Sequence, residues 1–131
     1  MGELKMFKQG LGNWTDYRWQ FSLEAEDEID LHFGKRERSS MSYEEAMAQV
    51  AELVENSLRQ AQEKGRSHIM FVHGWSTSLG WKKTTARSVV RGFMRSKSAT
   101  PLIERKSCIQ HESVFVAKIR PVHERATKQR L

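Results

Sequence analysis

Two short stretches of this chain combine side chains that can move protons with a glycine that admits a phosphate. Asp30 and His32 stand two residues apart, so their side chains project from the same face if the segment is a strand. His73 and Gly74 follow the next apolar run, Ile69–Val72. An imidazole can take a proton from an attacking hydroxyl or give one to a leaving oxygen. A carboxylate can orient that imidazole or bind a divalent cation. Cleavage of a phosphodiester needs these types of group.

The elements around these residues should bring them together. If the two apolar runs are neighbouring parallel strands, Asp30, His32 and His73 lie at their carboxyl ends, where open α/β sheets bind ligands. Gly74 would allow a close backbone approach. A second helix is expected to start beyond the next loop, and the N–H groups of its first turn could hold a phosphate.

The positive charge of the chain is concentrated in its second half. The net charge is +6, but residues 1–65 hold 8 Lys/Arg and 13 Asp/Glu, whereas residues 66–131 hold 14 and 3. Arg87, Arg91 and Arg95 are spaced by four, so they form one stripe on a helix. No acidic residue lies between Arg66 and Pro101. This asymmetry favours a polyanionic partner over intrahelical ion pairs.

A polar stretch before the second helix adds aromatic and basic groups. Trp75 and Trp81 stand in it, and Lys82 and Lys83 follow directly. A tryptophan in such a loop can stack on an unpaired base or pin the loop to the core, and the sequence favours neither. The two lysines are expected to contact a phosphate backbone. Together with Gly74 and the arginine stripe, these four residues form the predicted nucleic-acid-binding set.

The apolar patterns predict a mixed α/β fold. Ser42 and Glu45 form a capping box ahead of a helix that Gly65 ends, and Ala86, Val89, Val90 and Phe93 mark the buried face of a second helix. Alternation predicts a further strand near the N-terminus. The expected order is strand 17–23, strand 29–33, helix 42–65, strand 69–72, helix 85–96, strand 102–109 and strand 113–119. Helices should cover a mixed sheet of four or five strands, in a two-layer sandwich.

The chain is predicted to be one domain with two extensions. Residues 1–27 are expected to be an N-terminal arm containing a strand, residues 28–121 the domain, and residues 122–131 a basic tail. No apolar run is long enough to span a bilayer, and no secretory signal is apparent. Cys108 is the only cysteine, which is typical of a cytoplasmic protein, and it is expected to be a small buried hydrophobe. A monomer is expected.

These motifs resemble the Smr (small MutS-related) domain family over roughly residues 28–121. The resemblance is carried by Ile29–His32, by the capped helix that opens Ser42–Ala46 and by Ile69–Gly74. The chain departs from the family pattern at Phe33, which precedes the expected glycine, and at Ser76, where a second glycine is usual. The resemblance implies a βαβαββ fold and DNA nicking or RNA cleavage, with some members acting at ribosomes. It assigns Asp30 and His32 to the first motif, and His73 and Gly74 to the second.

The sequence therefore predicts a nucleic-acid endonuclease with Asp30, His32 and His73 as catalytic residues. RNA is favoured over DNA, because two histidines and a carboxylate can activate a 2′-hydroxyl without a metal. The sequence assigns no definite cofactor and leaves a divalent cation such as magnesium open, and no cysteine–histidine cluster predicts a zinc site. The alternative is a non-catalytic module on the same fold that binds RNA or the ribosome. A small-molecule phosphate hydrolase would not need so much positive charge.

Overall fold

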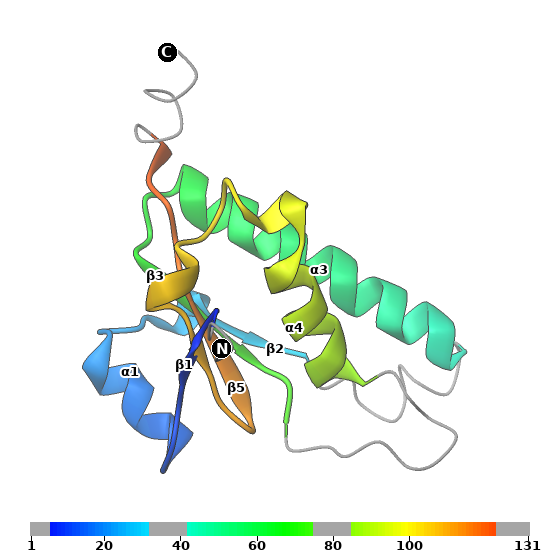
Figure 1. Cartoon of the computed structure of the whole chain (residues 1–131), viewed down its shortest axis with the longest axis horizontal. Coiled ribbons are helices and arrows are strands. Elements are labelled where there is room, and N and C mark those ends of the chain that lie inside the picture. Colours follow the sequence, from blue (N-terminus) through cyan, green and yellow to red (C-terminus); the bar gives the residue numbers. More distant parts are fainter. Residues whose placement is uncertain (1–5, 32–41, 75–84, 123–131) are drawn as a thin grey trace, which may run out of the picture.

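The computed structural model describes residues 6–31, 42–74 and 85–122 (Figure 1). Its helices are α1 (Tyr17–Gln20), α3 (Tyr43–Glu63) and α4 (Ala86–Arg95). Its strands are β1 (Lys8–Gln9), β2 (Glu28–Asp30), β3 (His68–Val72), β4 (Ile109–Gln110) and β5 (Val114–Lys118). Short 3-10 turns occupy Trp14–Asp16, Ala25–Asp27, Lys97–Ala99 and Arg105–Ser107.

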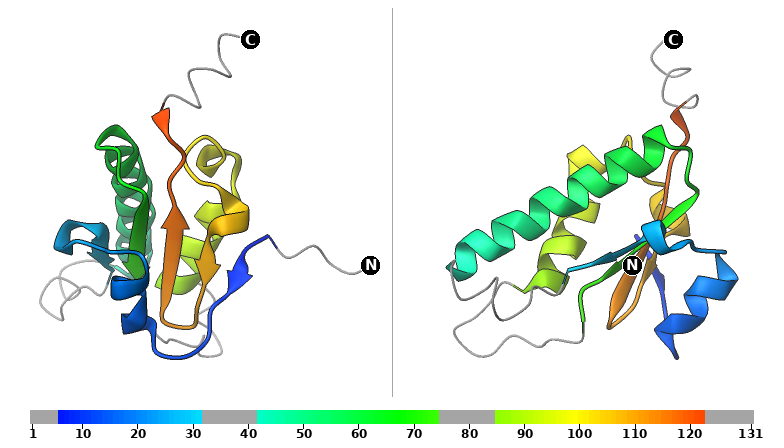
Figure 2. Two further views of the ribbon diagram at one scale, coloured as in Figure 1. Left: turned by 90° about the vertical axis from the view of Figure 1, so that its left-hand side faces the viewer. Right: turned by 180° about the vertical axis from the view of Figure 1, so that it is seen from behind.

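The strands form one mixed sheet in the order β1-β4-β5-β3-β2. Strand β2 is parallel to β3, β3 and β4 are antiparallel to β5, and β1 is parallel to β4. Helices α3 and α4 cover one face of the sheet, and α1 lies on the other (Figure 2). The predicted mixed α/β fold with four or five strands is therefore confirmed.

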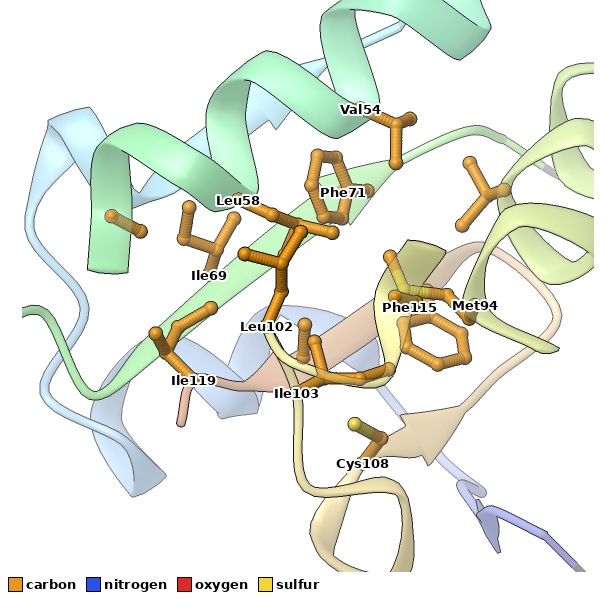
Figure 3. Packing of buried hydrophobic residues seen from close by; sticks show 14 of the residues in the cluster. Val54, Leu58, Ile69, Phe71, Met94, Leu102, Ile103, Cys108, Phe115 and Ile119 are labelled. Carbon is orange, nitrogen blue, oxygen red and sulfur yellow. The ribbon is translucent and has the colours of Figure 1, made fainter. Parts of the chain in front are cut away.

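The main core lies between the sheet and the two longer helices (Figure 3). Helix α3 begins at the predicted capping box, where the Ser42 hydroxyl accepts the Glu45 N–H at 3.1 Å and the Glu45 carboxylate accepts the Ser42 N–H at 2.8 Å. The inward stripes of α3 and α4 and the facing strands supply many of the fully buried side chains, including Val50, Val54, Leu58, Phe71, Val90, Met94 and Phe115. Within the described ranges, no helix is long and apolar enough to cross a membrane.

The strand predicted at 17–23 is wrong. The Asn13 side chain accepts the Thr15 N–H at 3.1 Å and starts a turn that continues into α1. On a strand, Tyr17 and Trp19 would share a face, but Tyr17 is buried and Trp19 is 83% exposed. Tyr17 instead contacts Phe21, four residues on, with ring centroids 6.0 Å apart. A run of seven alternating residues was too short to distinguish the two-residue period of a strand from the 3.6-residue period of a helix.

The N-terminal arm contributes its strand earlier, at Lys8–Gln9, where no local pattern predicts one. Phe7 lies in the main core, with its ring edge-on to Phe115 at 5.0 Å. At Gly10 a Cβ atom would overlap the Tyr17 hydroxyl and lie 2.7 Å from the Ile109 side chain. The arm is thus part of the same folded unit as residues 28–121.

The strand predicted at 102–109 is also wrong in extent. Only Ile109–Gln110 pairs as β4, and Ile103 forms a single bridge to Ile119. Between them Arg105 begins a 3-10 turn, and its guanidinium donates to the Met94 carbonyl at 2.8 Å. This hydrogen bond holds the segment against the end of α4 and away from the sheet.

Candidate functional site

One edge of the sheet gathers most of the described residues that the sequence predicts to act. The parallel strands β2 and β3 end there, with Asp30 aligned to Val72. Strand β5 starts beside them, because Val72 aligns with Val114. Helix α4 also begins near this edge (Figure 1). Asp30, His73 and the start of α4 therefore lie at one end of the molecule.

His73 is held by its backbone at the end of β3. Its N–H donates to the Ser113 carbonyl at 3.1 Å, and the Gly74 N–H donates to the same oxygen at 2.9 Å. Gly74 has a φ of +81°, a conformation that glycine adopts without strain. The His73 ring is 2% exposed, and its Nδ1 lies 2.9 Å from the Gly74 carbonyl. Because a carbonyl only accepts, Nδ1 carries the proton and Nε2 bears the lone pair.

The His73 imidazole is neutral at pH 7. Burial lowers its pKa to about 4, and the positive charges of Arg91 and Arg87 add to the shift, while the backbone of Gly74 and Val114 opposes it. Its Nε2 has no hydrogen-bond partner within the described residues. A buried acceptor without a partner is costly, so it favours a ligand that can donate to it.

Asp30 opens onto the other face of the sheet. It lines a pocket with Trp14, Arg18 and Val72 on the side of α1. Extending the register by one residue places Leu31 beside His73, and Leu31 belongs to the core under α3 and α4. Asp30 and His73 therefore share an edge of the sheet but not a face. The convergence expected from the sequence is thus only partial, since side chains alternate along β2 and β3.

The arginine stripe of α4 lies along the turn between β4 and β5. Arg91 donates to the His111 carbonyl at 3.1 Å, and Arg87 lies 3.4 Å from the Glu112 carbonyl. Arg95 lies 3.4 Å from the Gln110 side-chain oxygen. Burial, followed by the charges of Arg87 and Arg95, lowers the pKa of Arg91.

Carboxylates do not neutralise this stripe in the part of the chain that the structure describes. The ion pairs there are Arg18–Glu28, Arg59–Glu55 and Arg66–Asp27, and none includes α4. The Nε atom of Arg91 is buried without a hydrogen-bond partner among those residues. The charge of Glu112 acts on Arg91 and opposes the lowering of its pKa, but it forms no salt bridge with the described stripe. Three neighbouring positive charges favour an anionic ligand.

Five predicted site residues lie outside the described ranges: His32, Trp75, Trp81, Lys82 and Lys83. Of the predicted set, the structure thus places Asp30 on the α1 face and His73, Gly74, Arg87, Arg91 and Arg95 on the α4 side of the same edge.

His111 is not among the residues that the sequence predicts to act, yet it lies at this edge, between β4 and β5. Its Nδ1 accepts the Ser113 N–H at 3.0 Å, so its Nε2 carries the proton and donates to the Gly12 carbonyl at 2.8 Å. The ring thereby joins the N-terminal arm to the residue whose carbonyl holds His73 and Gly74. The sequence feature that could have singled out His111 is its place in the short turn before β5. Both ring nitrogens serve the fold, so His111 has a positioning role.

Two further features of the described residues concern possible metal ligands and the Cys108 thiol. No three His, Cys, Asp or Glu side chains gather there as metal ligands would. Cys108 is fully buried, as expected, and burial raises the pKa of its thiol to about 11. A protonated, inaccessible thiol is a poor nucleophile.

Comparison of the chain with protein-family models, curated proteins and solved structures gives no match. The residues at the sheet edge are therefore the basis on which a function is proposed.

Proposed function

We propose that this chain is a nucleic-acid endonuclease with an Smr-like domain, and that RNA is its preferred substrate. One observation carries the proposal: the neutral, buried imidazole of His73 lies beside Arg87 and Arg91 at the sheet edge where β2 and β3 end. These cations can hold a phosphate, and the arrangement leaves the His73 Nε2 lone pair able to accept a proton.

The order of elements supports the Smr-like assignment. From β2 onward the chain runs β2–α3–β3–α4–β4–β5, which is the βαβαββ order that the resemblance implies. The first motif falls at the end of β2 and the second at the end of β3. The parallel pairing of these two strands puts both motifs at the same edge.

The start of α4 offers a second set of donors for the same phosphate. The capping box uses two of its N–H groups, because Thr85 N donates to the Ser88 hydroxyl and Ser88 N to the Thr85 hydroxyl. The N–H groups of Ala86 and Arg87 lie in the same first turn, where a helix leaves its donors without intrahelical partners. A phosphate there would meet these N–H groups and the positive end of the helix dipole.

We assign proton transfer from the attacking hydroxyl to His32, with Asp30 orienting it, and phosphate placement to Arg87 and Arg91. His73 is assigned as the second proton-transfer group, because its Nε2 lone pair can accept a proton but cannot donate to a phosphate oxygen. In RNA the 2′-oxygen would attack phosphorus as His32 takes its proton. The bond to the 5′-oxygen would break, and a solvent water would give that oxygen a proton. The hydroxide left behind would take the proton held by His32, which restores the neutral histidine. The products would be a 2′,3′-cyclic phosphate and a 5′-hydroxyl. Arginine and N–H donors stabilise the charge that builds on the phosphate oxygens.

A non-catalytic nucleic-acid-binding module is the second candidate. The opposite faces of Asp30 and His73 favour it, because these two side chains do not form one acid–base pair. The burial of His73 also favours it, since a buried ring can serve the fold alone. This module would use the arginine stripe and leave the nucleic acid intact.

A substrate panel separates the two candidates. Purified protein would be incubated with end-labelled single- and double-stranded RNA and DNA, with magnesium and with a chelator, while binding is measured on the same strands. Cleavage of RNA with cyclic-phosphate ends supports the endonuclease. Binding without cleavage of any strand favours the module, and absence of binding at low salt refutes both.

A further inference from the structure

Two buried nitrogen atoms at the sheet edge have no hydrogen-bond partner within the described residues. They are Nε2 of His73, which is 2% exposed, and Nε of Arg91. The other ring nitrogen of His73 is occupied by the Gly74 carbonyl at 2.9 Å, and a terminal nitrogen of Arg91 donates to the His111 carbonyl at 3.1 Å. Because an unpaired polar atom is costly in the interior, these two atoms indicate a site for a small ligand.

The turn between β4 and β5 fixes both side chains at one place. The Ser113 carbonyl accepts the N–H groups of His73 and Gly74, at 3.1 and 2.9 Å. The His111 carbonyl accepts Arg91, and the Ser113 N–H donates to the His111 ring at 3.0 Å. The charge of Arg91 also acts on the His73 imidazole. The two unpaired atoms therefore belong to one site.

The two atoms require opposite partners. His73 Nε2 bears a lone pair and only accepts, whereas Arg91 Nε carries a hydrogen and only donates. An ionised phosphate oxygen could accept from Arg91 but could not donate to His73. A water molecule does both, and it keeps a second hydrogen and a second lone pair for reaction. The chemistry of the pair thus favours one bound water.

We propose that His73 and Arg91 hold a water that hydrolyses the 2′,3′-cyclic phosphate end of RNA to a 3′-phosphate, a second activity that rests on the proposed function. The cyclic end is the product that the proposed cleavage leaves at this place. Arg91 belongs both to the water site and to the pair assigned to hold the phosphate, so the water would lie beside the phosphorus atom. His73 is buried, so it reaches the phosphate only through this water.

The hydrolysis balances with water alone. The oxygen of the held water forms a bond to phosphorus from the side that the 5′-oxygen has left, as Nε2 of His73 takes one of its protons. The bond from phosphorus to the 2′-oxygen breaks, and a solvent water gives that oxygen a proton. The hydroxide left behind takes the proton from His73, which restores the neutral imidazole. One water is consumed, and the products are a 3′-phosphate and a 2′-hydroxyl.

Cyclic ends should form first and be hydrolysed later. Burial lowers the pKa of His73 to about 4, so its imidazole is a weak base at neutral pH. The rate of general base catalysis falls with the basicity of the catalyst. Hydrolysis is therefore expected to be slower than cleavage, and a time course should show the cyclic phosphate as an intermediate.

A strand with a preformed cyclic end tests the second activity separately from cleavage. It would be a 2′-O-methyl oligonucleotide whose last nucleotide alone is a ribonucleotide with a 2′,3′-cyclic phosphate, so it cannot be cut internally. Incubation in water enriched in heavy oxygen, followed by mass spectrometry, shows whether water opens the ring. We expect the protein to form the 3′-phosphate at least about a hundredfold faster than buffer, with one heavy oxygen atom in each product. A cyclic end that persists in the presence of protein that cleaves RNA would overturn the inference.

Two variants identify the water site as the source of hydrolysis. His73→Asn can keep a hydrogen bond to the Gly74 carbonyl through its amide N–H but lacks Nε2, and Arg91→Lys keeps the positive charge but lacks Nε. His73→Asn should lower kcat for hydrolysis of the cyclic end by about a hundredfold, and Arg91→Lys should lower kcat more than it raises KM. Arg59→Lys is the matched control, because Arg59 is exposed on α3 and pairs with Glu55.

Thermal melting accompanies each measurement. If folded His73→Asn hydrolyses the cyclic end at the wild-type rate, the inference is wrong. If His73→Asn does not fold, a wild-type kcat in folded Arg91→Lys overturns it instead.

These outcomes separate the second activity from the proposed function. Cleaved RNA whose cyclic ends are stable refutes hydrolysis by His73 and leaves the endonuclease in place. Absence of both cleavage and hydrolysis refutes the proposed function and this inference together.

Discussion

Asp30 and His73 end neighbouring parallel strands, yet their side chains lie on opposite faces of the sheet. Asp30 lines a pocket with Trp14 and Arg18, whereas His73 is buried beside the arginines of α4. The edge between them therefore has an acidic, aromatic side and a basic side.

Charge reversal on α4 should weaken the binding of nucleic acid. Arg87→Glu is expected to lower affinity and to reduce the slope of log K against log salt by about 0.7 for single strands, or about 0.9 for duplex DNA. Arg87 is suited to the test because its hydrogen bond to the Glu112 carbonyl is long, at 3.4 Å. Filter binding between 50 and 200 mM salt measures the slope.

Lys106→Glu is the matched control for that charge change. Lys106 is exposed and precedes β4, at the end of the sheet away from the candidate site. Equal effects of the two reversals would show that net charge, and not the stripe, governs binding.

His73 should make folding stability sensitive to mild acid. Its folded pKa of about 4 lies below the ordinary value of 6.5, so the unfolded chain binds this proton more readily. Stability is thus lost as pH falls from above 6.5 toward 4. Between pH 7 and pH 5 the loss from this group is about 2 kcal/mol. Urea unfolding of wild type and His73→Gln at both values measures it.

Comparison of wild type with His73→Gln separates the effect of His73 on stability from that of the carboxylates, which also titrate in acid. Asp27, for example, has its pKa lowered, with the hydrogen bonds and charge of Arg66 outweighing its burial. The stability advantage of wild type over His73→Gln should shrink by about 2 kcal/mol at pH 5. An advantage that is the same at both pH values would contradict the burial of a neutral imidazole.

Two glycine substitutions should change the free energy of unfolding in opposite directions. Gly10→Ala would force a Cβ atom into the Tyr17 hydroxyl and the Ile109 side chain, so it should destabilise the fold by about 1–3 kcal/mol. Gly92 lies within α4 with open space at its Cβ position, so Gly92→Ala should stabilise by about 0.5–1 kcal/mol. Chemical denaturation measures both. Tolerance of Gly10→Ala would argue against the packing of the N-terminal arm on β4.

Local sequence signals were sufficient for the elements that carry the core. The capping box at Ser42 and the apolar spacing after it placed α3, and the run Ile69–Val72 placed most of β3. In contrast, β1 has only two residues, and it pairs with Ile109 and Gln110 about a hundred positions later. Such a strand depends on contacts that no local pattern encodes.

The arrangement of the site depended on a register that the sequence does not reveal. Asp30 aligns with Val72, and a shift of one residue would have put Asp30 and His73 on the same face. The pocket that Asp30 lines with Trp14 and Arg18 was missed for a related reason. Its wall depends on the turn and helix at Trp14–Gln20, which alternation had predicted as a strand.

The assignment of proton transfer to His32 is tested most directly by single-turnover cleavage of RNA by His32→Ala. General acid–base catalysis contributes about 10²–10⁴-fold, so the variant should bind RNA like wild type, melt at a similar temperature and cleave at least about a hundredfold more slowly. If folded His32→Ala cleaves as fast as wild type, with contaminating nuclease excluded by repurification, His32 does not transfer the proton and the proposed endonuclease mechanism is wrong.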